Sequence, residues 1–95
     1  MKKLIAAATL ILVLGACSTN ETDFRDAAQK AIGGKDAETQ LGQKFEDINC
    51  ETPASKAVGT TFTCTAIGAS DGASFVFTAE IKSSKLVEIV DVQPG

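Results

Sequence analysis

The chain lacks three residue types on which many functional sites depend. Its 95 residues include no histidine, no tryptophan and no tyrosine. Histidine is the commonest general base of enzymes, so its absence removes the simplest route to acid and base catalysis. Tryptophan and tyrosine supply the usual flat platforms for sugars and nucleobases, and they anchor many protein interfaces. We therefore expect a protein that is not an enzyme and that uses no cofactor and no metal.

Positive charge is also scarce. Nine basic side chains stand against twelve acidic ones, and the formal net charge is −3. A protein that binds nucleic acid needs a basic patch or stripe to meet the phosphates. The charge balance therefore excludes nucleic acid as a partner.

The sequence has no hydrophobic run long enough to cross a membrane as a helix. Its apolar segment, residues 4–14, has eleven residues, whereas a spanning helix needs roughly 20. Lys2 and Lys3 precede this segment, and Leu14-Gly15-Ala16-Cys17 closes it. This order is typical of a bacterial lipoprotein signal peptide, here residues 1–16, whose cleavage leaves Cys17 as the lipidated first residue.

A lipidated Cys17 makes the membrane itself a partner of the protein. Acyl chains such as palmitate each contribute about 0.8 kcal/mol per buried CH₂, so two or three chains hold the protein on a membrane. Residues 17–22 are expected to form a short lipidated tether. The location is therefore extracytoplasmic, and in a cell with two membranes Ser18 favours the periplasmic side of the outer membrane.

Cleavage before Cys17 leaves 79 residues, with seven basic and twelve acidic side chains and a balance of −5. A single domain of this size, residues 23–95, gains only about 3–5 kcal/mol from its hydrophobic core. Cys50 and Cys64 remain as a pair in an oxidising compartment, so we expect a disulfide bond between them. Thirteen residues separate the two cysteines, and closing such a loop contributes about 3 kcal/mol.

The first predicted element is an amphipathic helix with Asp23 as its N-cap. Its apolar residues recur at helical spacing and form one stripe, and Gly33-Gly34 ends it: Phe24, Ala27, Ala28, Ala31 and Ile32. For residues 35–42 two alternatives stay open, namely one or two helical turns stopped by Gly42, or a loop.

From Phe45 onward the sequence alternates with the period of two that is typical of strands. Ile48 and Cys50 share one face of a first strand, and residues 53–59 form a connection. In the second strand, residues 60–67, three apolar side chains are predicted to point inward and three threonines outward. The inward set is Phe62, Cys64 and Ala66, and the outward set is Thr61, Thr63 and Thr65.

A turn at Ser70-Asp71-Gly72 leads into a third strand, which forms a hairpin with the second. Its predicted inward residues are Phe75, Phe77, Ala79 and Ile81. Residues 82–85 make the next turn, and residues 86–92 form a fourth strand. The phase of this last strand is ambiguous, because apolar residues occupy both of its faces. The fold class is therefore α+β, with an N-terminal amphipathic helix packed on a four-stranded antiparallel sheet and one disulfide.

Several of these features together resemble a small domain of unknown function found in many bacterial, especially actinobacterial, lipoproteins. They are Cys50, Pro53, Val58-Gly59, Phe62-Thr63-Cys64 and the Gly72 turn with the alternating strand after it, spanning roughly residues 45–92. In that family a Cys-Pro pair precedes Val-Gly-x-x-Phe-x-Cys, whereas Pro53 here stands three residues after Cys50. The resemblance implies a helix packed on an antiparallel sheet with one disulfide, and it implies no activity.

Candidate catalytic residues are few. The neighbours Ser55-Lys56 and Ser84-Lys85 lie in turns and point apart, so they do not make a serine and lysine dyad. Glu46-Asp47 and the pair Glu80 and Glu88 offer carboxylates, but nothing in the sequence buries them, and solvated faces explain them better.

Two functional hypotheses follow. The first is a non-catalytic binding or structural module of the cell envelope, with an envelope protein as its partner. Two surfaces are candidates for docking. One is the outward face of threonine and serine residues, which the preference of threonine for solvent-facing strands explains better. The other is the last strand, whose spare apolar face invites strand addition. The alternative is a protein inhibitor of a secreted hydrolase such as lysozyme, in which residues 68–74 form an inserting loop and the acidic surface meets a basic enzyme.

Overall fold

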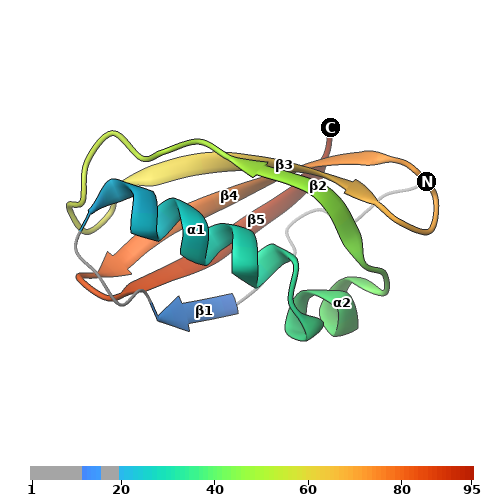
Figure 1. Ribbon diagram of the computed structural model, residues 1–95, viewed down its shortest axis with the longest axis horizontal. Coiled ribbons are helices and arrows are strands. Elements are labelled where there is room, and N and C mark those ends of the chain that lie inside the picture. The colour runs from blue at the N-terminus through green and yellow to red at the C-terminus, as the bar shows by residue number, and fades with distance from the viewer. Residues whose placement is uncertain (1–11, 16–19) are drawn as a thin grey trace.

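The computed structural model describes residues 12–15 and 20–95. Helix α1 (Glu21–Ile32) packs across one face of an antiparallel sheet, and the short helix α2 (Lys35–Leu41) follows it (Figure 1). Four further strands come next in the chain and pair in sequence order, namely β2 (Phe45–Cys50), β3 (Thr61–Gly68), β4 (Ser74–Ser83) and β5 (Leu86–Pro94). The predicted α+β fold, with a helix on four antiparallel strands, is confirmed.

The sheet has a fifth strand that the sequence analysis did not predict. Strand β1 (Leu12–Gly15) pairs with β5, so the sheet order is β1-β5-β4-β3-β2 (Figure 1). The helix is therefore not the N-terminal element of the whole chain. These four residues belong to the predicted signal peptide; its other residues and the lipidation site Cys17 lie outside the described residues.

Helix α1 begins earlier than predicted. Its N-cap is Asn20, whose side-chain oxygen accepts the backbone N–H of Asp23 at 3.0 Å, while the Asp23 carboxylate accepts the backbone N–H of Asn20 at 3.5 Å. This reciprocal capping box makes Asp23 the third residue of the helix and not its cap. Glu21 and Thr22, assigned to the tether from sequence, are consequently helical. The helix ends at Gly33, as expected.

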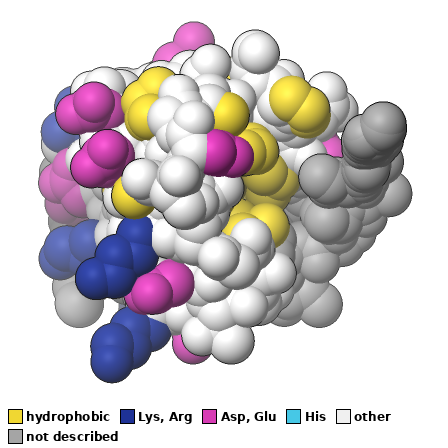
Figure 2. All heavy atoms as spheres, turned by 90° about the vertical axis from the view of Figure 1, so that its right-hand side faces the viewer, with side chains coloured by type: hydrophobic (Ala, Val, Ile, Leu, Met, Phe, Trp, Pro, Cys, Tyr) yellow, Lys and Arg dark blue, Asp and Glu magenta, His cyan; other side chains and the backbone are white. Residues whose placement is uncertain are grey.

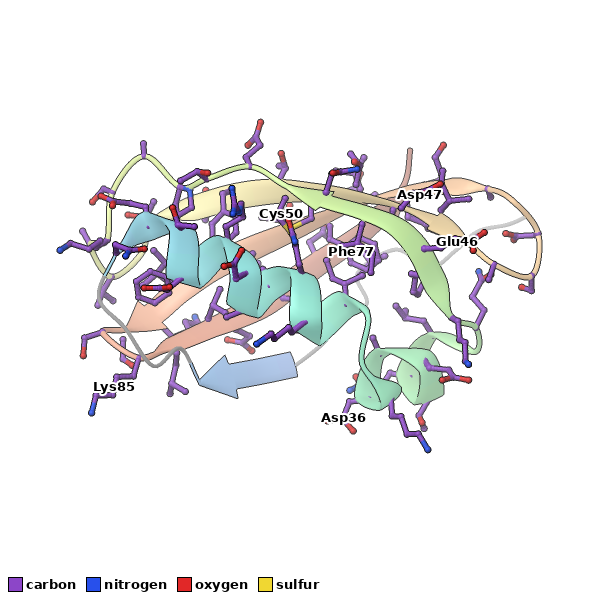
Figure 3. The ribbon with its side chains drawn as sticks, in the orientation of Figure 1. Asp36, Glu46, Asp47, Cys50, Phe77 and Lys85 are labelled. Carbon is purple, nitrogen blue, oxygen red and sulfur yellow. A yellow bond between two sulfur atoms is a disulfide. The ribbon has the colours of Figure 1, made fainter. Side chains whose placement is uncertain are left out.

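One core fills the space between α1 and the sheet. Every residue of the predicted helical stripe is buried, and three of the five are alanines, which let the helix lie close to the strands. Phe77 is completely buried beneath α1, and the ring of Phe45 meets it edge to face with centroids 5.2 Å apart (Figure 3). Each buried phenylalanine side chain contributes about 1.5–3 kcal/mol. The helix therefore covers the part of the inward face of the sheet that contains Phe77.

The segment after α1 is helical, which resolves the alternatives left open for residues 35–42. Helix α2 ends at Gly42, whose φ of 82° lies in the left-handed region. Glycine reaches this conformation without steric cost, so it stops the helix and reverses the chain toward β2.

Strand β2 contains a β-bulge. Phe45 and Ile48 are three positions apart and would point to opposite faces of a regular strand, but the bulge lets both contact the core. Between Glu46 and Asn49 the pairing with β3 shifts, and Asp47 adopts a positive φ of 52°. The extra residue reverses the alternation of faces at that point. Aspartate tolerates this backbone region better than most side chains.

A second bulge accounts for the ambiguous phase of the last strand. Thr78 pairs with Asp91 and Ala79 pairs with Ile89, so Val90 is the additional residue on β5. Ile89 and Val92 are both buried even though their spacing is odd. The apolar residues on the two sides of this bulge therefore belong to one inward face.

Candidate functional site

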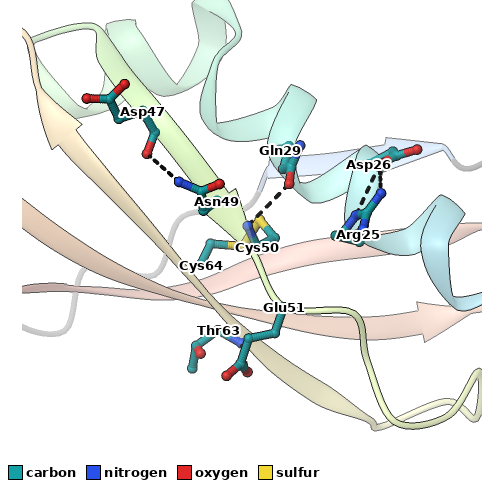
Figure 4. The surroundings of a disulfide bond; sticks show 9 residues. All are labelled: Arg25, Asp26, Gln29, Asp47, Asn49, Cys50, Glu51, Thr63 and Cys64. Atoms are coloured by element: carbon teal, nitrogen blue, oxygen red, sulfur yellow. Dashed lines mark hydrogen bonds and ion pairs between the residues drawn. A yellow bond between two sulfur atoms is a disulfide. The ribbon is translucent and has the colours of Figure 1, made fainter.

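The disulfide joins directly opposite residues of β2 and β3. Cys50 pairs with Cys64 in the sheet register, and the two sulfur atoms are 2.04 Å apart (Figure 4). Cys64 is completely buried, and Cys50 is partly buried against the same core. The bond thus fastens the edge strand β2 to its neighbour β3.

Helix α1 also holds this edge strand. The backbone N–H of Cys50 donates to the side-chain oxygen of Gln29 at 3.2 Å (Figure 4). Beyond the disulfide, Glu51 donates its N–H to the Thr63 carbonyl at 2.9 Å and accepts the Thr63 N–H through its side chain at 3.3 Å. These contacts give the cysteines a structural role.

The structure brings together only one of the two candidate carboxylate pairs. Glu80 and Glu88 are opposite each other on β4 and β5, and the Lys82 ammonium lies 3.6 Å from a carboxylate oxygen of each. Glu46 and Asp47 lie instead at the bulge of β2, and both are exposed (Figure 3). The lysine neutralises the repulsion between two like charges on neighbouring strands, so this cluster is an ion network of the sheet surface.

The serine and lysine neighbours do not form a site. Ser55 accepts the Ala57 N–H at 2.9 Å within the connection between β2 and β3, whereas Ser84-Lys85 forms the tight turn between β4 and β5 (Figure 3). The outward threonines of β3 are exposed, as predicted, and Thr63 lies beside Thr78 of β4. They lie on the face of the sheet opposite α1.

The turn between β3 and β4 uses its polar groups internally. The Ser70 hydroxyl donates to the side-chain oxygen of Gln43 at 2.6 Å, and the Ser70 backbone N–H donates to the same oxygen at 3.2 Å. The Asp71 carboxylate accepts the Ala73 N–H at 3.0 Å, and Gly72 has the positive φ expected for this turn. These hydrogen bonds stabilise the turn itself. The Ser70 hydroxyl and the Asp71 carboxylate are therefore already engaged within the turn, which gives the hydrolase inhibitor hypothesis no support.

Sequence analysis missed an apolar pocket at the end of the sheet, beyond the C-terminus of α1. The pocket has a volume of about 190 Å³. Hydrophobic side chains gather on this end of the molecule (Figure 2). The described residues that line the pocket are Leu41, Gln43, Phe45, Phe75, Val92, Gln93 and Pro94.

The geometry of this pocket follows from where α1 ends. Gly33 stops the helix before β5 ends, so α2 and the segment after it cover the remaining inward surface only in part. The rings of Phe45 and Phe75 meet edge to face, with centroids 5.5 Å apart. None of the described lining residues carries a charge or a nucleophile. The site therefore suits an uncharged apolar group.

Residues 12–15 and 20–95 contain no group of three or more histidine, cysteine, aspartate or glutamate residues arranged to hold a metal ion. No helix within these ranges is both long and apolar enough to cross a membrane.

Comparison with known proteins gave no match to a protein-family model, to a curated protein or to a solved structure. The resemblance to the lipoprotein domain of unknown function therefore stays a prediction.

We expect Cys64→Ala to lower the free energy of unfolding by about 2–5 kcal/mol, because the substitution removes a bond that closes a loop in a small domain. Urea unfolding of the oxidised protein measures this difference. Ala66→Ser, a substitution on the same strand that keeps the bond, serves as the control for polar and packing effects. Free thiols at Cys50 and Cys64 in the oxidised wild type would contradict the assignment.

Proposed function

We propose that the protein is a membrane-tethered extracytoplasmic lipoprotein that acts as a non-catalytic binding module of the cell envelope. Support for the tether comes from Leu14-Gly15-Ala16-Cys17 behind a short apolar segment and two lysines. The disulfide between Cys50 and Cys64 agrees with an oxidising compartment outside the cytoplasm.

The apolar pocket is the observation that carries the binding role. Its volume of about 190 Å³ exceeds the roughly 150 Å³ of a dry protein cavity that admits benzene. This volume accommodates one aromatic ring or one branched aliphatic side chain. Catalysis at neutral pH needs a group that transfers a proton or attacks a bond, and the described lining supplies none.

The position of the pocket suits a protein held at its N-terminus. Cys17 precedes the helix cap Asn20 by three residues, so only a short stretch of chain joins the anchor to the start of α1. The pocket lies past the other end of α1, and twelve helical residues extend about 18 Å. Anchoring at Cys17 consequently leaves the pocket at the end of α1 that is away from the anchor, where a partner can reach it.

The anchor is tested by Cys17→Ser in the full chain, expressed in a bacterium. The wild type is expected to begin at residue 17 and to carry the added mass of acyl chains, because the thiol is the acylation site. The variant is expected to lack acyl mass, whereas the neighbouring change Ser18→Ala keeps it. Intact mass spectrometry distinguishes these outcomes, and wild-type protein that starts at residue 17 without acyl mass contradicts the proposal.

Binding at the pocket is tested by titrating the mature protein with toluene, which has the size and chemistry of one apolar side chain. The methyl resonances of Leu41 and Val92 are expected to shift and saturate, while those of Val58, which is 67% exposed, stay unchanged. Val92→Phe is expected to weaken binding by about tenfold or more, because its ring fills the space and burial of such a ring is worth about 1.5–3 kcal/mol.

Val90→Phe is the matched control for the pocket, since it places the same ring at the bulge of the same strand. Its affinity for toluene is expected to equal that of the wild type. Equal loss in the two variants, or shifts spread evenly over the methyl groups, would show that toluene does not occupy this pocket.

A further inference from the structure

Strand β1 occupies one edge of the sheet with an uncharged apolar segment. Leu12 is opposite Ile89, Val13 is opposite Glu88, and Gly15 is opposite Leu86, so the two strands run antiparallel. Helix α1 also contacts β1, which therefore lies beside both β5 and α1 (Figure 1). This edge thus already holds an extended peptide whose sequence is Leu-Val-Leu-Gly.

Maturation would remove that peptide. This step rests on the proposed function, because cleavage before Cys17 takes residues 12–15 away with the signal peptide. The backbone N–H and C=O groups of β5 that point toward β1 then lose their partners. An unpaired strand edge is a template for another extended chain.

The opposite edge of the sheet is protected in ways that β5 is not. On β2, Gln29 accepts the backbone N–H of Cys50, and the bulge at Asp47 interrupts regular pairing. Charged side chains and bulges are the usual means by which proteins block an edge. Across the stretch that β1 covers, Leu86 to Ile89, β5 pairs with β1 in continuous register and has one charged residue, Glu88. Its register with β4 shifts between Val87 and Leu86, but this shift does not interrupt the pairing with β1.

We propose that the β5 edge of the mature lipoprotein binds an extended, uncharged apolar segment of another envelope protein in place of β1. The chemistry of this segment is that of the peptide already seated there. A second copy of the chain suits the edge less well, because its own β5 brings Glu88 and Asp91 and the mature protein has a balance of −5. Cleavage of the signal peptide therefore creates the binding site.

The test uses mature acylated protein in a non-ionic detergent and a fluorescein-labelled synthetic peptide with the sequence of residues 9–16. Fluorescence anisotropy measures its binding. The control peptide carries N-methyl groups at Val13 and Leu14. Successive N–H groups of a strand point to opposite sides, so one methyl group blocks the ladder whatever its phase, while the side chains stay the same.

The unmodified peptide is expected to bind the mature protein at least about tenfold more tightly than the methylated one, which corresponds to about 1.4 kcal/mol for one lost ladder bond. The uncleaved full chain with Cys17→Ser keeps β1 in place, and it is expected to bind the unmodified peptide at least about tenfold more weakly. Equal binding of both peptides overturns the inference, because it indicates uptake by the detergent or by a non-strand surface.

The register supplies a second readout. A peptide with Val13→Cys is expected to form a disulfide with mature protein carrying Glu88→Cys, and not with protein carrying Asp91→Cys, because Val13 is opposite Glu88. Cross-linking of both variants to the same extent contradicts the register.

Two further outcomes are decisive. Dimers of the mature protein that exclude the peptide would assign the edge to a second copy and overturn the inference. Intact mass of the same preparation separates the two proposals: protein without an acylated N-terminal Cys17 refutes the proposed function, whereas correctly acylated protein that does not bind the peptide refutes only the strand-addition site.

Discussion

The contact between the apolar stripe of α1 and the inward face of the sheet is the interaction on which the rest of the structure depends. Phe24 and Ile32 mark the two ends of this stripe, and the alanines between them allow close approach. No second helix layer covers the opposite face of the described strands, where threonines and an ion network meet water instead. A sheet of this kind without α1 would expose the whole row that includes Phe77.

The other stabilising features adapt the strands to that contact. The bulges at Asp47 and Val90 turn apolar residues of odd spacing toward α1, and the disulfide fastens the edge strand β2 to β3 beneath the helix. Where α1 stops at Gly33, its cover stops too. The pocket lined by Phe45 and Phe75 is the consequence, so the candidate binding site exists because the helix is shorter than the sheet.

Much of this architecture is predictable from local patterns. The helical stripe, the alternation of β3 and β4 and the turn at Gly72 each arise from neighbours in sequence, and the structure places them as expected. The start of α1 was misjudged because Asn20 and Asp23 cap each other, and either residue type is a good N-cap when taken alone. The bulges depend on pairing with a neighbouring strand, so alternation within one strand does not reveal them.

The two candidate binding features were harder to predict for a different reason. The pocket combines residues from α2, β2, β4 and β5, and none of these segments has a local signal for a void. Strand β1 comes from a segment whose composition indicates a cleaved signal, so its pairing with β5 has no counterpart in the sequence pattern. On the proposed function, signal cleavage opens the β5 edge that β1 closes in the precursor.

Amide hydrogen exchange tests this central claim most directly, by comparing β5 in the uncleaved full chain and in the mature protein. The account predicts that the amides of Leu86 to Ile89 directed toward β1 exchange much faster in the mature form, while those bonded to β4 keep the same protection. Equal protection of all four amides in the two forms would contradict it.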